Sequence, residues 1–451
     1  MQPNALLDAL LAEAGMSHAG LAAHVNQAGR SRGLALRYEH TAVSRWLKGQ
    51  RPRGQVPDLI CEVLGGRLHR PLRLDDIGLG IPGQPDRHGP HGSHGDRIDG
   101  FVDRATALWR SDELGRPAQL GAEAVTGTPA VIPVWEWENP PEDADVSRSG
   151  PRRIGPEHIE ILRAARAHYE LMYRRAGGMA TRARIVRFLG SETAPMLRGG
   201  YPDEVGRLLY RATGSLVAVA GICAYDSDAH GLAQRYFHQA LRLAKASGDR
   251  GLGAYVIALL VNQLLHLREY RQAVAFAEAA LRAAGRHTTP ALAADLYAMQ
   301  AKAYAQLGDP GAALACIHSA EAAAERIRPG AEPAETGYVQ PGLVNVQVAE
   351  ALLSLGDLDA AHAQAAEAVG TPAHDRGRVH RLAMLCEIQL RQGEADRAVA
   401  SAAEMAERAQ GMESLRLRDR LRAVREALLT SGCAGAQETA QLIDGALRVP
   451  L

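Results

Sequence analysis

A pattern of small residues recurs five times in the second half of the chain, and it constrains the fold more than any other feature. Each copy has alanine first, a small or apolar residue four positions later, and alanine or methionine three positions after that. Spacings of three and four place these side chains on one helix face, where small residues allow two helices to approach closely. The copies are 40, 40, 48 and 37 residues apart: Ala233/Phe237/Ala240, Ala273/Ala277/Ala280, Ala313/Ile317/Ala320, Ala361/Ala365/Ala368 and Ala398/Ala402/Met405.

Two further positions repeat with this pattern. A small or apolar residue stands twelve positions before each leading alanine, and a glycine stands five positions before the last three (Gly308, Gly356 and Gly393). The arrangement resembles the tetratricopeptide repeat, in which two antiparallel helices meet at small side chains and glycine occupies the turn. The spacing exceeds the usual period of about 34, so the helices should be longer than standard. We predict an all-α solenoid over residues 153–451, with an amino-terminal helical pair in residues 160–197 and a closing helix in residues 415–429.

A solenoid of this kind has a concave groove, and the repeat register predicts its lining. Asn262 and Lys302 occupy the same position in successive repeats, where an amide and an ammonium group suit a peptide backbone or a carboxylate. The alternative is that such polar side chains merely face solvent inside an empty superhelix. The loop at residues 332–341 accounts for the 48-residue step, and a loop of this length is often functional. The predicted effector groove consists of Tyr225, Tyr255, Asn262, His266, Asp295, Met299, Lys302, Gln347 and Glu350.

Residues 1–80 have the pattern of four short helices. Asn4 and Ser17 are placed to cap the first two, and Pro57 falls in the first turn of the fourth, where proline is tolerated. In the third helix we expect Thr41 to be the cap and Gly49 to end the helix. One face of this helix then packs into a small core (Val43, Trp46 and Leu47), and the other faces solvent (Thr41, Ser44, Arg45 and Lys48).

The solvent-facing side of the third helix has the chemistry of a DNA-binding surface. Hydroxyl and cationic side chains contact phosphates and base edges in a major groove, although an ordinary surface helix shows the same pattern. The whole chain has 51 basic and 51 acidic residues, so any preference for DNA must be local. Over residues 26–53, seven cations face one acid, a net charge of +6. The predicted DNA-binding residues are Arg30, Arg32, Arg37, Tyr38, His40, Thr41, Ser44, Arg45, Lys48, Arg51 and Arg53.

Residues 17–64 also carry a resemblance. Leu21-Ala22, Thr41-Ala-Val-Ser-Arg-Trp-Leu-Lys-Gly49 and Arg51-Pro52 resemble the phage-repressor (XRE) class of helix-turn-helix domains. In that class the second helix braces the DNA backbone and the third enters the major groove. The sequence departs from the class at residues 26–38, where a glycine- and arginine-rich segment replaces a short turn. Its arginines are placed to form a wing or arm along the phosphates.

Residues 81–152 have the composition of a linker with a small docking segment. Glycine and proline dominate residues 80–95, and they forbid a stable helix that could hold His88, His91 and His94 on a metal ion. We therefore expect no structural metal there. The apolar stretch at residues 131–137 includes two tryptophans and is expected to be a small strand or a segment that docks on a neighbouring domain.

Several classes of protein are disfavoured by the sequence. It contains no Walker motif, no H-E-x-x-H and no G-x-S-x-G, so we expect neither an enzyme nor a cofactor. Its five cysteines are far apart and none forms a C-x-x-C pair, which favours a reduced, cytoplasmic protein. The amino terminus lacks the features of a signal peptide, and apolar runs such as residues 254–261 are too short to span a bilayer, so no membrane partner is expected.

The order of helix-turn-helix head, linker and repeat array resembles the large actinobacterial regulators that control Streptomyces differentiation. The resemblance implies a repressor of development or of secondary metabolism. The architecture is also similar to the peptide-pheromone receptors of Gram-positive bacteria, whose repeat groove binds a short peptide. The first hypothesis is a sequence-specific transcription regulator that binds double-stranded DNA as a homodimer and responds to a peptide or small-molecule effector. The alternative is an interaction scaffold whose repeats bind a partner protein and whose head binds DNA without specificity.

Overall fold

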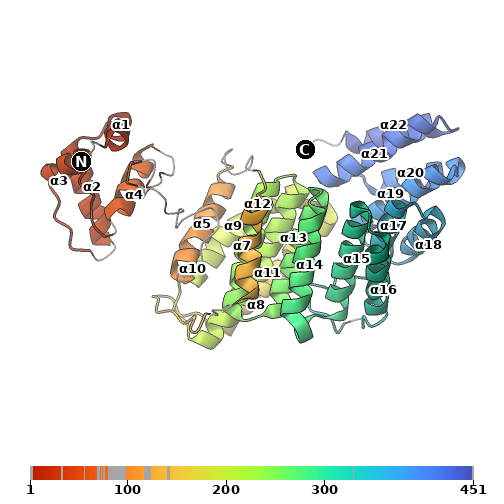
Figure 1. Ribbon diagram of the computed structural model, residues 1–451, viewed down its shortest axis with the longest axis horizontal. Coiled ribbons are helices and arrows are strands. Elements are labelled where there is room, and N and C mark those ends of the chain that lie inside the picture. Colours follow the sequence, from red (N-terminus) through yellow and green to blue (C-terminus); the bar gives the residue numbers. More distant parts are fainter. Residues whose placement is uncertain are drawn as a thin grey trace. The chain divides into compact units, whose positions relative to one another are not determined.

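The computed structural model divides the chain into two compact units, Met1–Gly89 and Pro90–Leu451 (Figure 1). It describes residues 4–31, 34–54, 56–68, 72, 74, 77–79, 98–115, 123–139, 143–328 and 330–448. Within these ranges nearly all regular structure is helical, and β-type pairing is limited to two isolated bridges, Arg148 with Tyr201 and Arg153 with Gly200. The predicted all-α class is therefore confirmed.

The amino-terminal unit consists of α1 (Ala5–Glu13), α2 (His18–Ser31), α3 (His40–Leu47) and α4 (Val56–Leu68). Apolar side chains from all four helices are buried together in one small core. The predicted helix starts are confirmed, because the Asn4 side chain accepts a hydrogen bond from the Leu7 amide and Ser17 Oγ accepts one from the Gly20 amide, each at 3.1 Å. This core fixes which face of α3 remains exposed.

The second unit is an array of helical pairs that follow one another along the chain (Figure 1). Its early helices are α5 (Ile98–Glu113), α7 (Thr128–Glu138), α8 (Pro156–Ala176), α9 (Gly178–Phe188), a π-helical segment η1 (Leu189–Thr193) and α10 (Ala194–Leu197). The pairs are α11 (Asp203–Asp226) with α12 (His230–Ser247), α13 (Arg250–His266) with α14 (Tyr270–Ala284), α15 (Pro290–Leu307) with α16 (Pro310–Ala324), α17 (Pro341–Leu355) with α18 (Leu358–Gly370), α19 (Asp375–Gln392) with α20 (Ala395–Arg408), and α21 (Leu415–Ser431) with α22 (Ala436–Leu447). A short 3-10 segment, η2 (Gly285–His287), follows α14.

The repeated small residues lie where the two helices of each pair meet. All fifteen residues of the pattern are buried on the second helices, and the residues twelve positions earlier are buried on the first helices. Gly221 in α11 illustrates the reason, because a Cβ atom there would lie 2.5 Å from the Phe237 ring of α12. The solenoid-like arrangement of the predicted repeat region is thus confirmed, with helices that meet through alanine and glycine.

The turn inside each repeat needs a left-handed residue. Gly308, Gly356 and Gly393 cap α15, α17 and α19 with φ of 74°, 85° and 78°. The first two repeats have Asp228 (φ 58°) and Arg268 (φ 63°) at the same position, five residues before the leading alanine. The backbone of the turn is therefore shared by all five repeats, although glycine marks only three of them.

The described part of the expected linker packs on the array. α7 lies against α12 and α14, and α5 lies against α9. Trp137 is buried on Gly253 of α13, where a Cβ atom would lie 2.0 Å from its indole nitrogen. The stretch at residues 131–137 docks as part of a helix and does not form the strand that was the other expectation. His88, His91 and His94 lie outside the described residues.

Contacts distant in sequence join the two ends of the array. Asp226, at the end of α11, is fully buried. Its carboxylate accepts hydrogen bonds from the Gly178 amide (2.7 Å) and from Ser414 Oγ (2.7 Å), and it forms an ion pair with Arg376. The Glu413 amide also donates to the Ala176 carbonyl at 2.8 Å. The start of α21 is thereby fixed against the end of α8, so the superhelix closes on itself.

The loop that lengthens the third repeat also crosses the array. Glu335, 4% exposed, pairs with Arg211 of α11 (3.1 Å) and accepts a hydrogen bond from Ser215 Oγ (2.7 Å). Arg166 of α8 donates to the Ala334 carbonyl at 3.1 Å, and Tyr338 donates to Asp295 of α15 at 2.6 Å. The loop therefore connects α8, α11 and α15 on the inner side of the solenoid.

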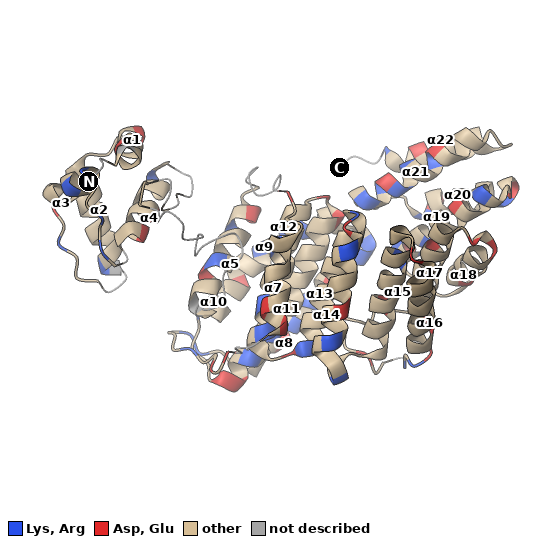
Figure 2. Cartoon of the chain, in the orientation of Figure 1, with Lys and Arg blue, Asp and Glu red and all other residues tan. Residues whose placement is uncertain are grey.

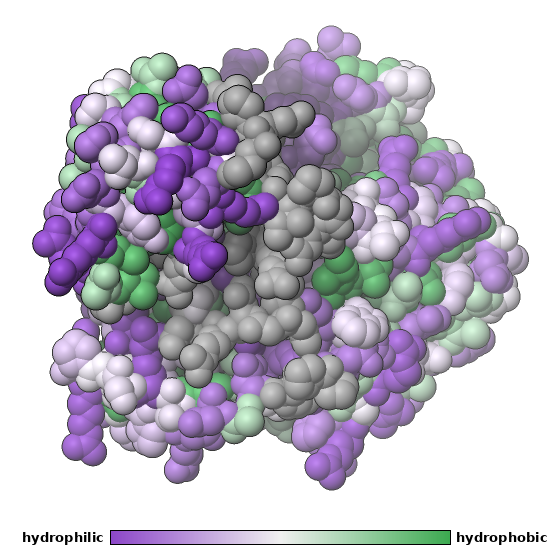
Figure 3. All heavy atoms as spheres, turned by 60° about the vertical axis from the view of Figure 1, so that its left-hand side comes forward, coloured by the Kyte–Doolittle hydropathy of each residue, from purple (hydrophilic) through white to green (hydrophobic). Residues whose placement is uncertain are grey.

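One described helix, α11, is long and apolar enough to cross a membrane by length and composition. Within the unit, however, 83% of its apolar window is buried, as in the core helix of a globular array. On the face in Figure 3, hydrophilic side chains cover most of the described surface and apolar ones form small patches. The length of α11 is thus weak evidence for a membrane span.

Candidate functional sites

The two faces of α3 differ as the sequence predicts. Val43 and Trp46 are buried in the core, whereas Thr41, Arg45 and Lys48 are exposed and Ser44 is half-buried. Figure 2 shows the cationic positions on this helix. The predicted cap is wrong, because the helix begins at His40 with Glu39 as its cap, which places Thr41 inside the first turn. Gly49 follows the end of the helix with φ of 94°, as expected.

Contacts from the rest of the unit hold α3 in place. The backbone N–H of Asn4 donates a hydrogen bond to the Leu47 carbonyl at 2.8 Å, which fixes the end of the helix. Tyr38 meets the edge of Trp46 with ring centroids 5.2 Å apart, which fixes its start. Ser44 Oγ lies 3.4 Å from His18 Nδ1 at the beginning of α2. The exposed side chains of α3 are therefore presented from a rigid support.

The long segment between α2 and α3 is partly helical. α2 continues to Ser31, so the first part of the inserted residues extends that helix, and residues 34–39 are described without regular secondary structure. The Asn26 side chain clamps the far end, since its Oδ1 accepts from the Tyr38 amide and its Nδ2 donates to the Tyr38 carbonyl, each at 2.8 Å. The segment is thus held at both ends by the unit itself.

The other predicted DNA-binding residues are distributed around α3. Arg37, His40 and Arg53 are exposed, and Arg30 is exposed with its Nε 3.4 Å from the Asn26 carbonyl. Arg51 is exposed but donates to the Leu79 carbonyl, which gives it a structural contact within the unit. Tyr38 is half-buried against Trp46, and Arg32 lies outside the described residues.

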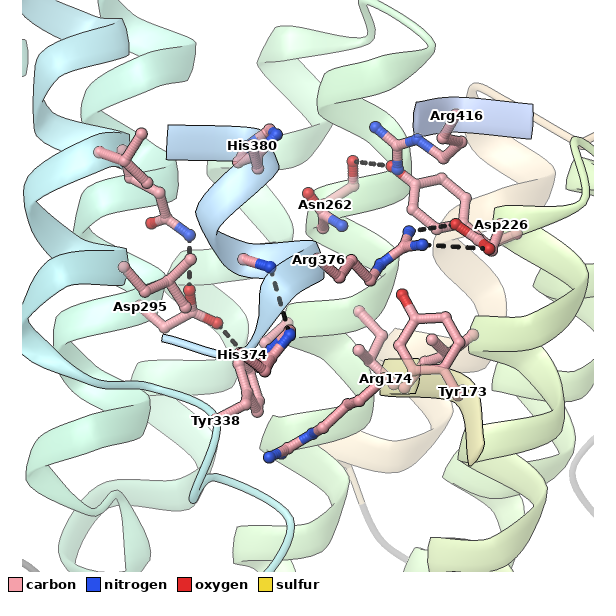
Figure 4. A pocket seen from close by; sticks show the side chains of 18 of the residues that line it. Tyr173, Arg174, Asp226, Asn262, Asp295, Tyr338, His374, Arg376, His380 and Arg416 are labelled. Atoms are coloured by element: carbon pink, nitrogen blue, oxygen red, sulfur yellow. Dashed lines mark hydrogen bonds and ion pairs between the residues drawn. The ribbon is translucent and has the colours of Figure 1, made fainter. Parts of the chain in front are cut away.

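The second unit contains a cavity of about 330 Å³ inside the closed array. Its walls come from α8, α11, α12, α13, α15, α17, α19 and α21, together with Tyr338 and Gln340 of the crossing loop. Figure 4 shows that Arg376 and Arg416 lie on one side, near Asp226, and that Asp295 and Tyr338 lie on the other. Cavities of a few hundred Å³ with a mixed apolar and polar lining are typical of small-molecule sites.

Seven of the nine predicted groove residues line this cavity: Tyr225, Tyr255, Asn262, Asp295, Met299, Lys302 and Gln347. Glu350 pairs with Lys302 at 2.8 Å and faces a neighbouring hollow. His266 is exposed beside His230, outside the cavity. Gln347 Oε1 is buried and has no hydrogen-bond partner among the described residues, which leaves an acceptor at the wall near Asp295.

The cations of the cavity differ in their partners. Arg376 pairs with Asp226, Lys302 with Glu350, and Arg174 with Glu170 at 2.6 Å. Arg381 donates to carbonyl groups at the end of α18, including that of Ala368 at 2.9 Å. Within the described ranges, Arg416 and Arg420 of α21 make no ion pair or hydrogen bond. Arg416 instead lies over the Tyr225 ring at 3.9 Å, a cation–π contact.

Two histidines report a positive potential in the cavity. Arg420, together with burial, lowers the pKa of His380 to about 3. Burial, together with Arg174 and Arg376, lowers the pKa of His374 to about 4. Burial also lowers the pKa of Arg416 to about 10. Both imidazoles are therefore neutral near pH 7, because a further positive charge in this cavity is unfavourable.

One group of described side chains has the composition of a metal site. Asp228, His230 and His266 lie at the turns after α11 and α13, with their ligand atoms within 4.8 Å of one another. The Asp228 carboxylate already lies 2.8 Å from His230 Nε2, and an ion pair explains that contact without a metal. Burial, followed by His230, lowers the pKa of His266. The group is compatible with a metal ion but gives no further sign of one.

Residues 7–80 are similar to the SP15 N-terminal domain. The match spans α1 to α4 and the short segment after them, and therefore includes the whole exposed face of α3. The chain has no match among curated proteins.

The SP15-like region contains the predicted DNA-binding residues, but several residues of the cavity were not predicted. Tyr173, Arg174, Asp226, His374, Arg376, His380, Arg416 and Arg420 were absent from the predicted groove. They come from α8, from the end of α11 and from the last repeats. The repeat register predicts positions along successive first helices, whereas these residues meet only because the superhelix closes. The alternation of arginine at positions 416, 418 and 420 was the one available signal.

Proposed function

We infer that the chain is a sequence-specific DNA-binding transcription regulator and that α3 is the helix that enters the major groove. The observation that carries this proposal is the division of α3 into a buried apolar face and an exposed face of hydroxyl and cationic side chains. Thr41, Arg45 and Lys48 lie on that exposed face, and Arg37 and Arg53 are exposed in the chain on either side of the helix. An arginine in such a position can read a guanine, while a lysine contacts phosphates.

Mobility-shift assays on fragments of the source genome, followed by footprinting on the promoter of the protein's own gene, test this proposal. We expect a protected site, and we expect Arg45→Gln to weaken binding to it by about 1–3 kcal/mol if Arg45 reads a base. Lys48→Gln should weaken binding to all sequences alike and reduce the salt dependence by about one phosphate contact. Arg67→Gln, at an exposed position of α4, is the matched control.

The biological role is part of the same proposal. The resemblance of the whole architecture to the regulators of Streptomyces differentiation supports a cytoplasmic repressor of development or of secondary metabolism. We expect a homodimer in which the helical array provides the contact, with two heads on half-sites roughly 34–36 Å apart or a multiple of that distance. Sedimentation with and without operator DNA measures the stoichiometry.

The cavity in the helical array supports control by an effector. A solenoid whose two ends meet around a ligand site links occupancy of that site to the shape of the array. Equal and weak affinity for every DNA fragment would contradict sequence-specific regulation. That result would favour the alternative, a scaffold whose repeats bind a partner protein.

A further inference from the structure

The cavity of the second unit has more positive than negative charge on its walls. Six cationic side chains line it, against three carboxylates: Arg174, Lys302, Arg376, Arg381, Arg416 and Arg420 against Glu170, Asp226 and Asp295. Four of the six cations are engaged by carboxylates or carbonyl groups of the protein. The excess is therefore located on Arg416 and Arg420, one helical turn apart on α21.

Two guanidinium groups without counter-ions are unfavourable in a partly enclosed cavity unless something is gained from them. The two carboxylates nearest to them among the described residues are already paired: Asp419 with Arg422 at 2.7 Å, and Glu350, which lies near Arg420, with Lys302 at 2.8 Å. Two histidines of the lining have lowered pKa values: that of His380 is lowered by Arg420 and by burial, and that of His374 by burial and by Arg174 and Arg376. The surroundings thus favour the entry of a negative charge and disfavour a positive one.

The rest of the lining is apolar. Val219 and Ile222 of α11, Leu259 of α13, Met299 of α15 and Leu343 and Val346 of α17 face the cavity. A small inorganic anion would leave this surface uncovered, whereas an apolar chain or ring attached to the anion would bury it. The lining therefore suits a ligand that has both an anionic group and an apolar part.

We propose that the cavity binds a small amphipathic organic anion, whose carboxylate or phosphate ester pairs with Arg416 and Arg420 and whose apolar body lies against α11, α13, α15 and α17. Guanidinium groups bind both head groups through paired hydrogen bonds. This inference rests on the proposed function only in regarding the occupant as the regulator's effector. It places the charge-recognising residues on α21, the helix whose first residues close the superhelix.

Calorimetric titration of the full-length protein with four matched probes tests the proposal: octanoate, octyl phosphate, octanol and octylamine. We expect octanoate or octyl phosphate to bind at least about tenfold more tightly than octanol, because a charge-assisted hydrogen bond is gained. Octylamine should bind most weakly. The order of the two anions distinguishes a carboxylate site from a phosphate-ester site. The proposal would be overturned if octanol bound as tightly as both anions, or if neither octanoate nor octyl phosphate bound.

The double variant Arg416→Gln/Arg420→Gln separates recognition from folding. It should lose the preference for the anions and keep the affinity for octanol within about threefold, which shows that the cavity is intact. Arg397→Gln removes one charge from an exposed position on α20, outside the cavity, and should bind all probes as the wild type does. A double variant that retains the full anion preference would refute the role of α21. These titrations contain no DNA, so a failure of sequence-specific DNA binding would defeat the proposed function and leave their outcome unchanged.

Discussion

Arginine side chains have different surroundings in the two units. The difference distinguishes arginines that are available to bind a ligand from arginines that stabilise the fold. In the amino-terminal unit Arg37, Arg45 and Arg53 are exposed and, among the described residues, have no hydrogen bond or ion pair. In the second unit Arg211 and Arg376 are held by the buried carboxylates of Glu335 and Asp226. Substitution in the first group should affect ligands and leave the fold intact, whereas substitution in the second should affect the fold. Arg416 and Arg420 belong to neither group, which is why they indicate a ligand.

The largest effect is expected from removing a buried partner. Asp226→Ala should lower the free energy of unfolding by about 3–5 kcal/mol, because it leaves Arg376 and Ser414 without their acceptor inside the array. Denaturant unfolding followed by circular dichroism measures the change. Asp419→Ala, an exposed carboxylate on α21, should change stability by no more than about 0.5 kcal/mol. If Asp226→Ala lowered the free energy of unfolding by as little as Asp419→Ala, the distinction between supporting and exposed charged groups would be wrong.

Arg45→Gln should show the opposite balance. Its expected cost is in DNA affinity, about 1–3 kcal/mol, while the melting temperature of the protein should be unchanged because the side chain is exposed and unpaired among the described residues. Thermal unfolding of the free protein, run beside the mobility-shift assay, checks both halves of this prediction. A fall in melting temperature with normal DNA binding would mean that α3 is an ordinary surface helix.

Acid should weaken the second unit through its engaged carboxylates. Burial alone would raise the pKa of Glu350, but Lys302 and Arg420 outweigh it and lower that pKa from the usual 4.5 to about 2. A carboxyl group with a lowered pKa stabilises the fold above its unfolded pKa, and this contribution is lost as pH falls from about 4.5 toward 2. Glu335 has a lowered pKa for the same reason, through Arg211 and Ser215. We expect Glu350→Gln to flatten the stability profile in this range by on the order of 1 kcal/mol, measured by denaturant unfolding at successive pH values.

The smallest effect is a gain. Arg268 occupies the left-handed turn position at which glycine stands in the last three repeats. Arg268→Gly should therefore raise the free energy of unfolding by about 0.5–1 kcal/mol, because relief of backbone strain exceeds the added freedom of the unfolded chain. Thermal unfolding should show a correspondingly small rise in melting temperature. Gly308→Arg is the reverse control and should lower stability by a similar or larger amount. A change of the same sign in both variants would mean that the two turns are not equivalent.

The regular parts of the fold were predictable because they depend on local spacing. Ala273, Ala277 and Ala280 fall on one helix face by arithmetic alone, and Asn4 and Ser17 are placed as caps by their neighbours. The cavity was predictable only in part, since Asn262 and Met299 follow the repeat register but Arg376 and Arg416 do not. Their position depends on the curvature of the array, which accumulates over all the repeats. An arginine-rich composition also concealed them, because abundance gives no weight to a single arginine.

The buried carboxylate of Asp226 has a consequence for how the protein unfolds. Open repeat arrays are quasi-one-dimensional: each repeat contacts its neighbours, and unfolding can begin at either end. Here the hydrogen bond from Ser414 to Asp226 spans 188 residues of chain, so the terminal repeats are tied to the first ones. Fraying of α21 would remove Ser414 from this carboxylate and leave the buried Asp226 with Gly178 and Arg376 as partners. We expect the second unit to unfold in one cooperative transition and to fold slowly, since its closing contact is among the most distant in sequence.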